Sequence, residues 1–116
     1  MSDPLSDVTI LVARDGMGHA DTGLKHKLAA TYFDLLDLED RLPRHICFYA
    51  EGVKLACEGS VVLDTLKALD DRGVTLLVCT TCLQTFNLEA SLRAGTASNM
   101  KAIQAAQWAV AKVISI

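Results

Sequence analysis

The apolar positions of the chain follow two kinds of pattern, which alternate along its length. Short apolar runs, rich in β-branched side chains and typical of buried strands, occupy residues 8–13, 45–50, 74–79 and 112–116. Longer segments with apolar side chains at steps of three and four residues, typical of helices, occupy residues 21–40, 60–72 and 98–109. Because such strands and helices are joined by right-handed crossovers, the alternation predicts an α/β fold with a mostly parallel sheet.

The ends and apolar faces of these helices can also be assigned. Asp21 is expected to be the N-cap of the first helix, and Gly73 the left-handed residue after the second. Thr81 and Gln84 fit a capping box, which places Cys82 at the first position of a short helix over 82–86. Another short helix is expected within 52–59, and 74–79 as the most central strand. In the first helix, the helical spacing is carried by Leu24, Leu28, Thr31, Leu35 and Leu38. In the second, one face carries Val62, Leu63, Leu66 and Leu69, and in the last, one stripe carries Met100, Ile103 and Val110.

Composition narrows the class of protein. A chain of 116 residues, 51% hydrophobic and 22% charged, predicts one domain over residues 1–116, with 1–7 flexible. The net charge of -3 and the lack of a basic cluster make nucleic acid and membranes poor partners. No apolar run approaches the roughly 20 residues that cross a bilayer, and no leader precedes the first strand, so a cytoplasmic location is expected. A mean hydropathy of +0.29 is high for so small a domain and predicts contact with another subunit.

The four cysteines carry the main chemical signal. They are too few for a disulfide-stapled secreted scaffold, and two of them, Cys79 and Cys82, form a single C-x-x-C. Both thiols are expected at the carboxyl edge of the sheet, where the crevices of open α/β folds lie. A helix N-terminus there favours a nucleophilic thiolate. The alternative is a pair of small, buried core residues.

The sequence gives less support for a metal site or a nucleotide site. A zinc site needs four ligands and the chain offers one cysteine pair, so no metal is expected. Gly16 and Gly18 are followed by Asp21 where a dinucleotide fingerprint has its third glycine, so no nucleotide, flavin or other cofactor is expected. His19 and Cys57 lie in loops of the same rim and stay open as contributors. Dithiol redox exchange stays open as an alternative function, and Cys47 is expected in the core.

Several blocks of sequence together carry a family resemblance. Residues 48–55, 58–60, 77–83 and 112–116 read FYAEGVKL, EGS, LVCTTCL and KVISI, and Asn99 and Met100 open the last helix. With these blocks, residues 8–116 resemble the DsrE-like sulfur-relay family, and especially the C-terminal domain of YedF-type proteins linked to selenium and sulfur metabolism. In place of the family's usual C-G-T-C, Thr80 replaces the glycine.

The resemblance implies a flavodoxin-like, three-layer α/β/α fold and a homo-oligomer, with trimer, hexamer and dimer all open. It also implies that Cys79 receives sulfane sulfur as a persulfide and relays it to a protein partner such as a TusA-like protein. We therefore expect a small sulfur carrier or sulfurtransferase in which Cys82 is the auxiliary thiol. The alternative is an oligomeric adaptor that is not catalytic. The residues leave open the donor, the acceptor and the choice between sulfur and selenium.

Overall fold

The fold is built on one parallel sheet. A computed structural model describes residues 5–116 of the chain, and its strands pair in the order β4-β3-β2-β1-β5. The strands are β1 (Val8–Val12), β2 (His45–Phe48), β3 (Thr75–Cys79), β4 (Thr96–Ser98) and β5 (Lys112–Ser115). β1 and β2 are buried at most positions, as expected for strands covered on both faces.

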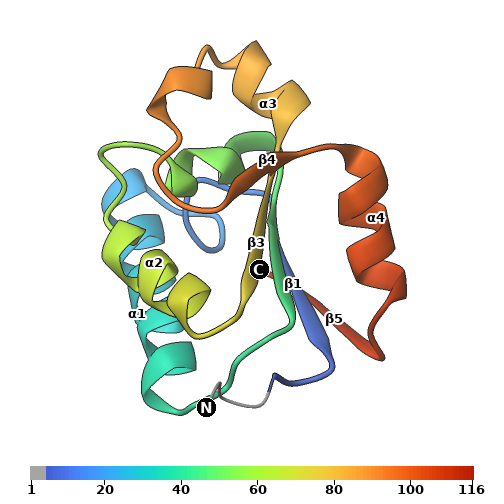
Figure 1. Cartoon of the computed structure of the whole chain (residues 1–116). Coiled ribbons are helices and arrows are strands. Elements are labelled where there is room, and N and C mark those ends of the chain that lie inside the picture. Colours follow the sequence, from blue (N-terminus) through green and yellow to red (C-terminus); the bar gives the residue numbers. More distant parts are fainter. Residues whose placement is uncertain (1–4) are drawn as a thin grey trace.

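Helices cover both faces of this sheet (Figure 1). From β1 to β4 the chain steps in one direction across the sheet, and it then reverses to reach β5. Because crossovers are right-handed, α1 and α2 lie on one face and α4 on the other. The helices are α1 (Thr22–Leu38), α2 (Leu63–Asp71), α3 (Thr80–Thr85) and α4 (Met100–Trp108), with 3-10 segments η1 (Ala50–Ala56) and η2 (Glu89–Ser91). The predicted three-layer, flavodoxin-like architecture is confirmed, although flavodoxin itself has the strand order 2-1-3-4-5.

The sheet contains one strand that the sequence did not predict. β4 has only three residues, with no apolar run, and it pairs with β3 so that Ser98 lies opposite Cys79. Gly95 precedes β4 with a φ of 77°, and a Cβ there would lie 2.8 Å from the Cβ of Leu76, so glycine allows the close approach. With β4 in place, β2 is the central strand. The prediction that residues 74–79 form the most central strand is therefore wrong.

The apolar spacing of α1 marks a helix, as predicted, but it does not coincide with the buried face of that helix. The leucines that carry the helical spacing are the exposed large side chains of this helix: Leu24, Leu28, Leu35 and Leu38. The residues that are fully buried against the sheet are instead Ala29 and Phe33, at a spacing of four. A small residue such as Ala29 brings the helix axis close to the sheet, and Phe33 then fills the remaining space beside Phe48, 6.5 Å away between ring centroids.

Helix ends agree with the sequence in some places and differ in others. The Asp21 carboxylate accepts a hydrogen bond from the Leu24 N–H at 2.9 Å, and Gly73 has a φ of 101°, so both predicted caps are confirmed. The capping box is wrong, because α3 begins at Thr80 with Cys79 as its N-cap residue. Cys82 is consequently the third residue of α3 and not the first. α2 likewise begins at Leu63, three residues after the predicted start.

The amino-terminal segment joins the sheet at the edge opposite Cys79. Residues 1–4 lie outside the described part of the chain. The Ser6 N–H donates to the Leu42 carbonyl at 2.7 Å, and the Asp7 carboxylate accepts from the Ala111 N–H at 3.2 Å. Among residues 5–116, no helix has the length and apolar character needed to cross a membrane.

Candidate functional site

Cys79 lies where β3 ends and α3 begins. Its side chain is 3% exposed, and its backbone is extended, as is usual for an N-cap residue. The next residue holds this junction in place, because the Thr80 hydroxyl donates to the Ser98 carbonyl of β4 at 2.9 Å. Thr80 thus ties the start of α3 to the neighbouring strand.

Cys82 lies one turn further along α3 and is half-buried. Its Sγ accepts a hydrogen bond from the Ala50 N–H at 3.1 Å. Ala50 is the first residue of η1, two positions after the end of β2, and its φ of 49° is in the left-handed region. The structure therefore brings together two of the loops that the sequence placed at the same rim, the one after β2 and the one after β3.

The surroundings of Cys82 favour its protonated form. Burial raises the pKa of the Cys82 thiol, and a hydrogen bond to Cys79 and the charge of Cys79 raise it further. The Ala50 N–H lowers it, but less than burial raises it. The raised pKa means that the Cys82 thiol keeps its proton at neutral pH, although the sequence places it near a helix N-terminus.

Segment η1 covers the thiol pair. Gly52 packs so closely against β1 that a Cβ there would lie 2.0 Å from the Val12 carbonyl oxygen. Lys54 extends from the same segment to α3, where its Nζ lies 4.8 Å from the centroid of the Phe86 ring. It also pairs with Glu51 at 2.6 Å, and this hydrogen bond raises the pKa of Lys54. Apart from its spacing of three from Glu51, no local pattern distinguishes Lys54 from other surface lysines.

Two clefts, of about 390 and 450 Å³, open beside η1 and share Asp15 and Lys54 as lining residues. The smaller cleft is lined by Cys57 and by His26, which contacts Asp15 at 3.2 Å. The larger cleft is lined by His19, whose Nε2 lies 2.8 Å from the Arg14 guanidinium. His26 was missed because nothing in its helical spacing distinguishes it from a surface residue.

The remaining cysteines, Cys57 and Cys47, are both buried. Cys57 is 2% exposed, and its thiol donates to the Val53 carbonyl at 3.2 Å. Burial raises its pKa, and the positive charge of Arg93 partly offsets this. Cys47 is fully buried in β2, which confirms its predicted place in the core, and burial raises its pKa to about 11. Within residues 5–116, no three His, Cys, Asp or Glu side chains are grouped so that they could hold a metal ion.

This combination defines an α/β protein with a parallel sheet and a thiol pair at its carboxyl edge. Comparison with protein families adds the particular group: the chain belongs to the DsrE/DsrF-like family, which matches residues 7–115. Comparison with curated proteins gives no match.

Solved structures share the fold. The chain is similar to MTH1491 from Methanobacterium thermoautotrophicum, a protein of unknown function, with a TM-score of 0.67 and 18% identity over 94% of this chain and 97% of that one. It is also similar to the ychN protein from E. coli, with a TM-score of 0.63 and 14% identity over 97% of this chain and 100% of that one. At these identities the likeness concerns the fold.

Proposed function

We propose that this protein is a small sulfur carrier or sulfurtransferase that holds sulfane sulfur as a persulfide on Cys79. One observation carries the proposal: Cys79 and Cys82 lie together at the carboxyl end of β3, beneath η1, with the Cys82 thiol held by the Ala50 N–H. Membership of the DsrE/DsrF-like family, whose members generally act in sulfur relay, supports the same chemistry.

The loading step transfers one sulfur atom without net oxidation. The Cys79 thiolate attacks the terminal sulfur of a donor persulfide, R–S–SH. A bond forms between Cys79 Sγ and that sulfur, the donor S–S bond breaks, and the donor leaves as the thiolate R–S⁻. Delivery reverses these bond changes on an acceptor thiolate. A protein donor or acceptor, such as a TusA-like protein, fits this scheme.

The two thiols have different roles in the scheme. Because the pKa of Cys82 is raised and its thiol donates to Cys79, Cys82 keeps its proton while Cys79 is the attacking group. Once Cys79 carries a persulfide, a Cys82 thiolate can attack Cys79 Sγ. This forms a Cys79–Cys82 disulfide and releases HS⁻. The high pKa of Cys82 slows this discharge at neutral pH and so lengthens the life of the persulfide.

Access to Cys79 requires movement of its cover. With only 3% of its surface exposed, Cys79 is closed to a donor persulfide while η1 rests on α3. The contact between Lys54 and Phe86 and the bond from Ala50 to Cys82 are the interactions that must separate. A partner that engages Lys54 would open the thiol pair as it docks.

Sulfur loading of single variants tests the proposal. The purified, reduced protein is incubated with a low-molecular-weight persulfide and its intact mass is measured. The parent should gain about 32 Da, the mass of one sulfur atom. Cys79→Ser should not load, whereas Cys82→Ser should load and keep its persulfide longer, because the internal attack is removed.

Cys57→Ser is the matched control, since Cys57 is also buried near the rim but donates to a backbone carbonyl instead of the pair. It should load as the parent does. Loading of Cys82→Ser but not of Cys79→Ser supports the carrier. The reverse result would show that Cys82, and not Cys79, carries the sulfur. Equal loading of all three variants would show that neither thiol of the pair is required, which contradicts the proposed carrier.

The burial of Cys79 favours a second candidate, a dithiol redox protein or an oligomeric adaptor in which the pair only packs. Thiol alkylation at increasing pH separates these functions. An adaptor should show two slow thiols with no reactive phase near neutral pH. A redox protein should form the Cys79–Cys82 disulfide reversibly and load no sulfur.

A further inference from the structure

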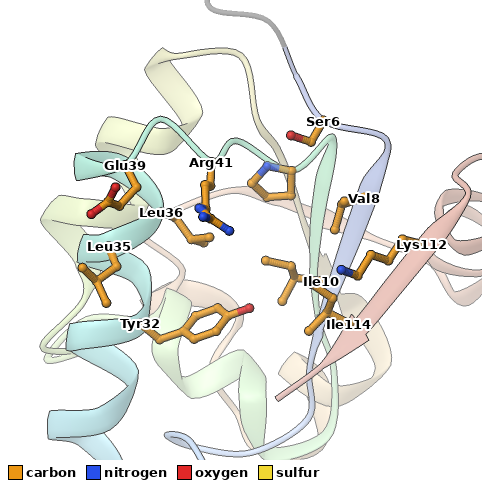
Figure 2. A pocket seen from close by; sticks show the side chains of 11 residues that line it. Ser6, Val8, Ile10, Tyr32, Leu35, Leu36, Glu39, Arg41, Lys112 and Ile114 are labelled. Carbon is orange, nitrogen blue, oxygen red and sulfur yellow. The ribbon is translucent and has the colours of Figure 1, made fainter.

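A groove of about 550 Å³ lies at the opposite edge of the sheet from the thiol pair, between α1 and the strands β1 and β5 (Figure 2). Its floor comes from Ile10 and Ile114 on the sheet and from Leu36 on α1. The volume lies in the range of small-molecule sites, which are mostly apolar with a few polar groups that fix orientation. Neither cysteine of the pair lines it, so it is separate from the proposed sulfur site.

Three polar groups point into this groove. Figure 2 shows the Arg41 guanidinium, the Lys112 ammonium and the Tyr32 hydroxyl directed toward its centre, while the Glu39 carboxylate points away on the helix side. Neither Arg41 nor Lys112 forms an ion pair with any residue in the described part of the chain. Two unpaired cations thus share the groove with one phenol hydroxyl.

The residues that line the groove indicate a ligand with a negative charge and an apolar part. Arg41 and Lys112 are both exposed and therefore open to an anion from solution. Arg in particular binds carboxylates through two parallel hydrogen bonds. The groove is much larger than a lone inorganic anion requires, and its floor gains free energy only from burying hydrocarbon. An apolar protein surface on the groove would leave both cations buried without partners, which is unfavourable.

We propose that this groove binds a small amphipathic carboxylate, with the carboxylate between Arg41 and Lys112 and its hydrocarbon part on the floor of Ile10, Leu36 and Ile114. The Tyr32 hydroxyl donates a further hydrogen bond to the carboxylate. A straight-chain acid of moderate length has both features and serves as the probe.

The test titrates the full chain with octanoate by calorimetry and by amide chemical shifts, with octanol as the uncharged probe of equal length. Octanoate should bind saturably, shift the amides of Ile10 and Ile114, and bind more tightly than octanol. Arg41→Gln and Lys112→Gln should each weaken octanoate binding about tenfold, as expected for the loss of one charged hydrogen-bond partner. Lys67→Gln, which removes an exposed cation of α2 outside the groove, should leave it unchanged.

Several outcomes overturn the proposal. The first is equal affinity of the protein for octanoate and for octanol, and the second is an octanoate affinity in Arg41→Gln that equals that of the parent. The third is octanoate binding that does not saturate below about 10 mM, because such binding is too weak to be specific. If Arg41→Gln changes the sedimentation of the protein and not its octanoate binding, the groove is instead an interface between copies. The comparison of octanoate with octanol uses the unaltered protein, so it tests carboxylate binding even where a variant fails to fold.

Discussion

Cys82 has two hydrogen-bonding neighbours with opposite effects on its proton. The Ala50 N–H stabilises the thiolate, whereas Cys79 and the low polarity of the site stabilise the thiol. The balance places the pKa of Cys82 above the ordinary value of 9.0. A thiol at the third position of a six-residue helix thus takes its protonation state from its burial and its neighbour more than from the helix.

Replacing Cys79 should lower the pKa of Cys82. In Cys79→Ala the hydrogen bond and the charge of Cys79 are both lost, while the Ala50 N–H remains as the group that favours the thiolate. The rate of Cys82 alkylation, measured against pH by mass spectrometry, should therefore rise at a lower pH than in the parent. Cys57→Ala is the control and should leave the Cys82 profile unchanged. An unchanged or upward-shifted profile in Cys79→Ala would show that Cys79 does not set the proton on Cys82.

At the scale of elements, η1 depends on one glycine. Gly52→Ala would place a Cβ 2.0 Å from the Val12 carbonyl oxygen, and both sides of this contact are backbone. We expect the free energy of unfolding in urea to fall by about 2 to 3 kcal/mol. Because η1 would also shift away from α3, Cys82 alkylation should become faster.

Gly23→Ala is the matched control for this substitution. Gly23 lies in the first turn of α1, and a Cβ there would meet only the Asp21 carboxylate, at an ordinary 3.5 Å. Alanine favours the helix, so the same urea measurement should show no loss and a gain of up to about 1 kcal/mol. A tolerated Gly52→Ala would mean that η1 does not rest on β1 as tightly as this contact requires.

The elements that sequence reasoning predicted are those in which local pattern and tertiary packing agree. β1, β2 and α2 have apolar periodicity that matches their burial. In α1 the leucines repeat at helical spacing on the exposed side, while the buried side uses Ala29 and Phe33, so the pattern indicated the helix but not its buried face. β4 was missed because its pairing with β3 stabilises it, and Thr96, Ala97 and Ser98 carry no pattern of their own.

The same reasoning explains how much of the site was predictable. Cys79 and Cys82 are three positions apart in the sequence and lie at a strand end, so their place at the rim follows from topology. The contact of Cys82 with Ala50 joins residues 32 positions apart, and it depends on a left-handed backbone at a residue that is not glycine. Local pattern carries no signal for such a contact, nor for Lys54 lying over Phe86.

For the whole molecule, burial of Cys47 predicts how stability depends on pH. The pKa of this thiol is about 11 in the folded chain, against 9.0 for an ordinary thiol. A folded pKa above the unfolded value means that the stabilising contribution is complete below pH 9 and is lost as the pH rises toward 11. The loss attributable to Cys47 is about 2 to 3 kcal/mol, from roughly 1.4 kcal/mol for each pKa unit.

Cys47→Ala isolates this contribution. The variant should be less stable than the parent at neutral pH, because it leaves a small cavity in β2. The difference in the free energy of unfolding, measured in urea under reducing conditions, should narrow between pH 9 and pH 11, since the variant lacks the thiol that titrates. Other groups titrate in both proteins and cancel in the difference. A constant gap over this range would contradict the assigned pKa.

The exposed apolar surface predicts assembly. Trp108 of α4 is 85% exposed and Met100 of the same helix is 53% exposed. Val113 lies on this face as well, since Lys112 and Ile114 line the groove on the other face of β5 and strand side chains alternate. Leaving such side chains in water is unfavourable, and a second copy of the chain is the partner always present at equal concentration. We therefore expect a homo-oligomer built through the α4 face.

Trp108 provides the measurement, because it is the single tryptophan of the chain. Sedimentation at micromolar concentration should give multiples of 12.5 kDa, and dilution should shift the tryptophan emission to longer wavelength as Trp108 becomes exposed. Trp108→Ser should weaken assembly, whereas Leu38→Ser, which alters an equally exposed position of α1 on the other face of the sheet, should not. A species of 12.5 kDa alone, with emission that does not change on dilution, would show that the chain is a monomer and that the α4 face serves another partner.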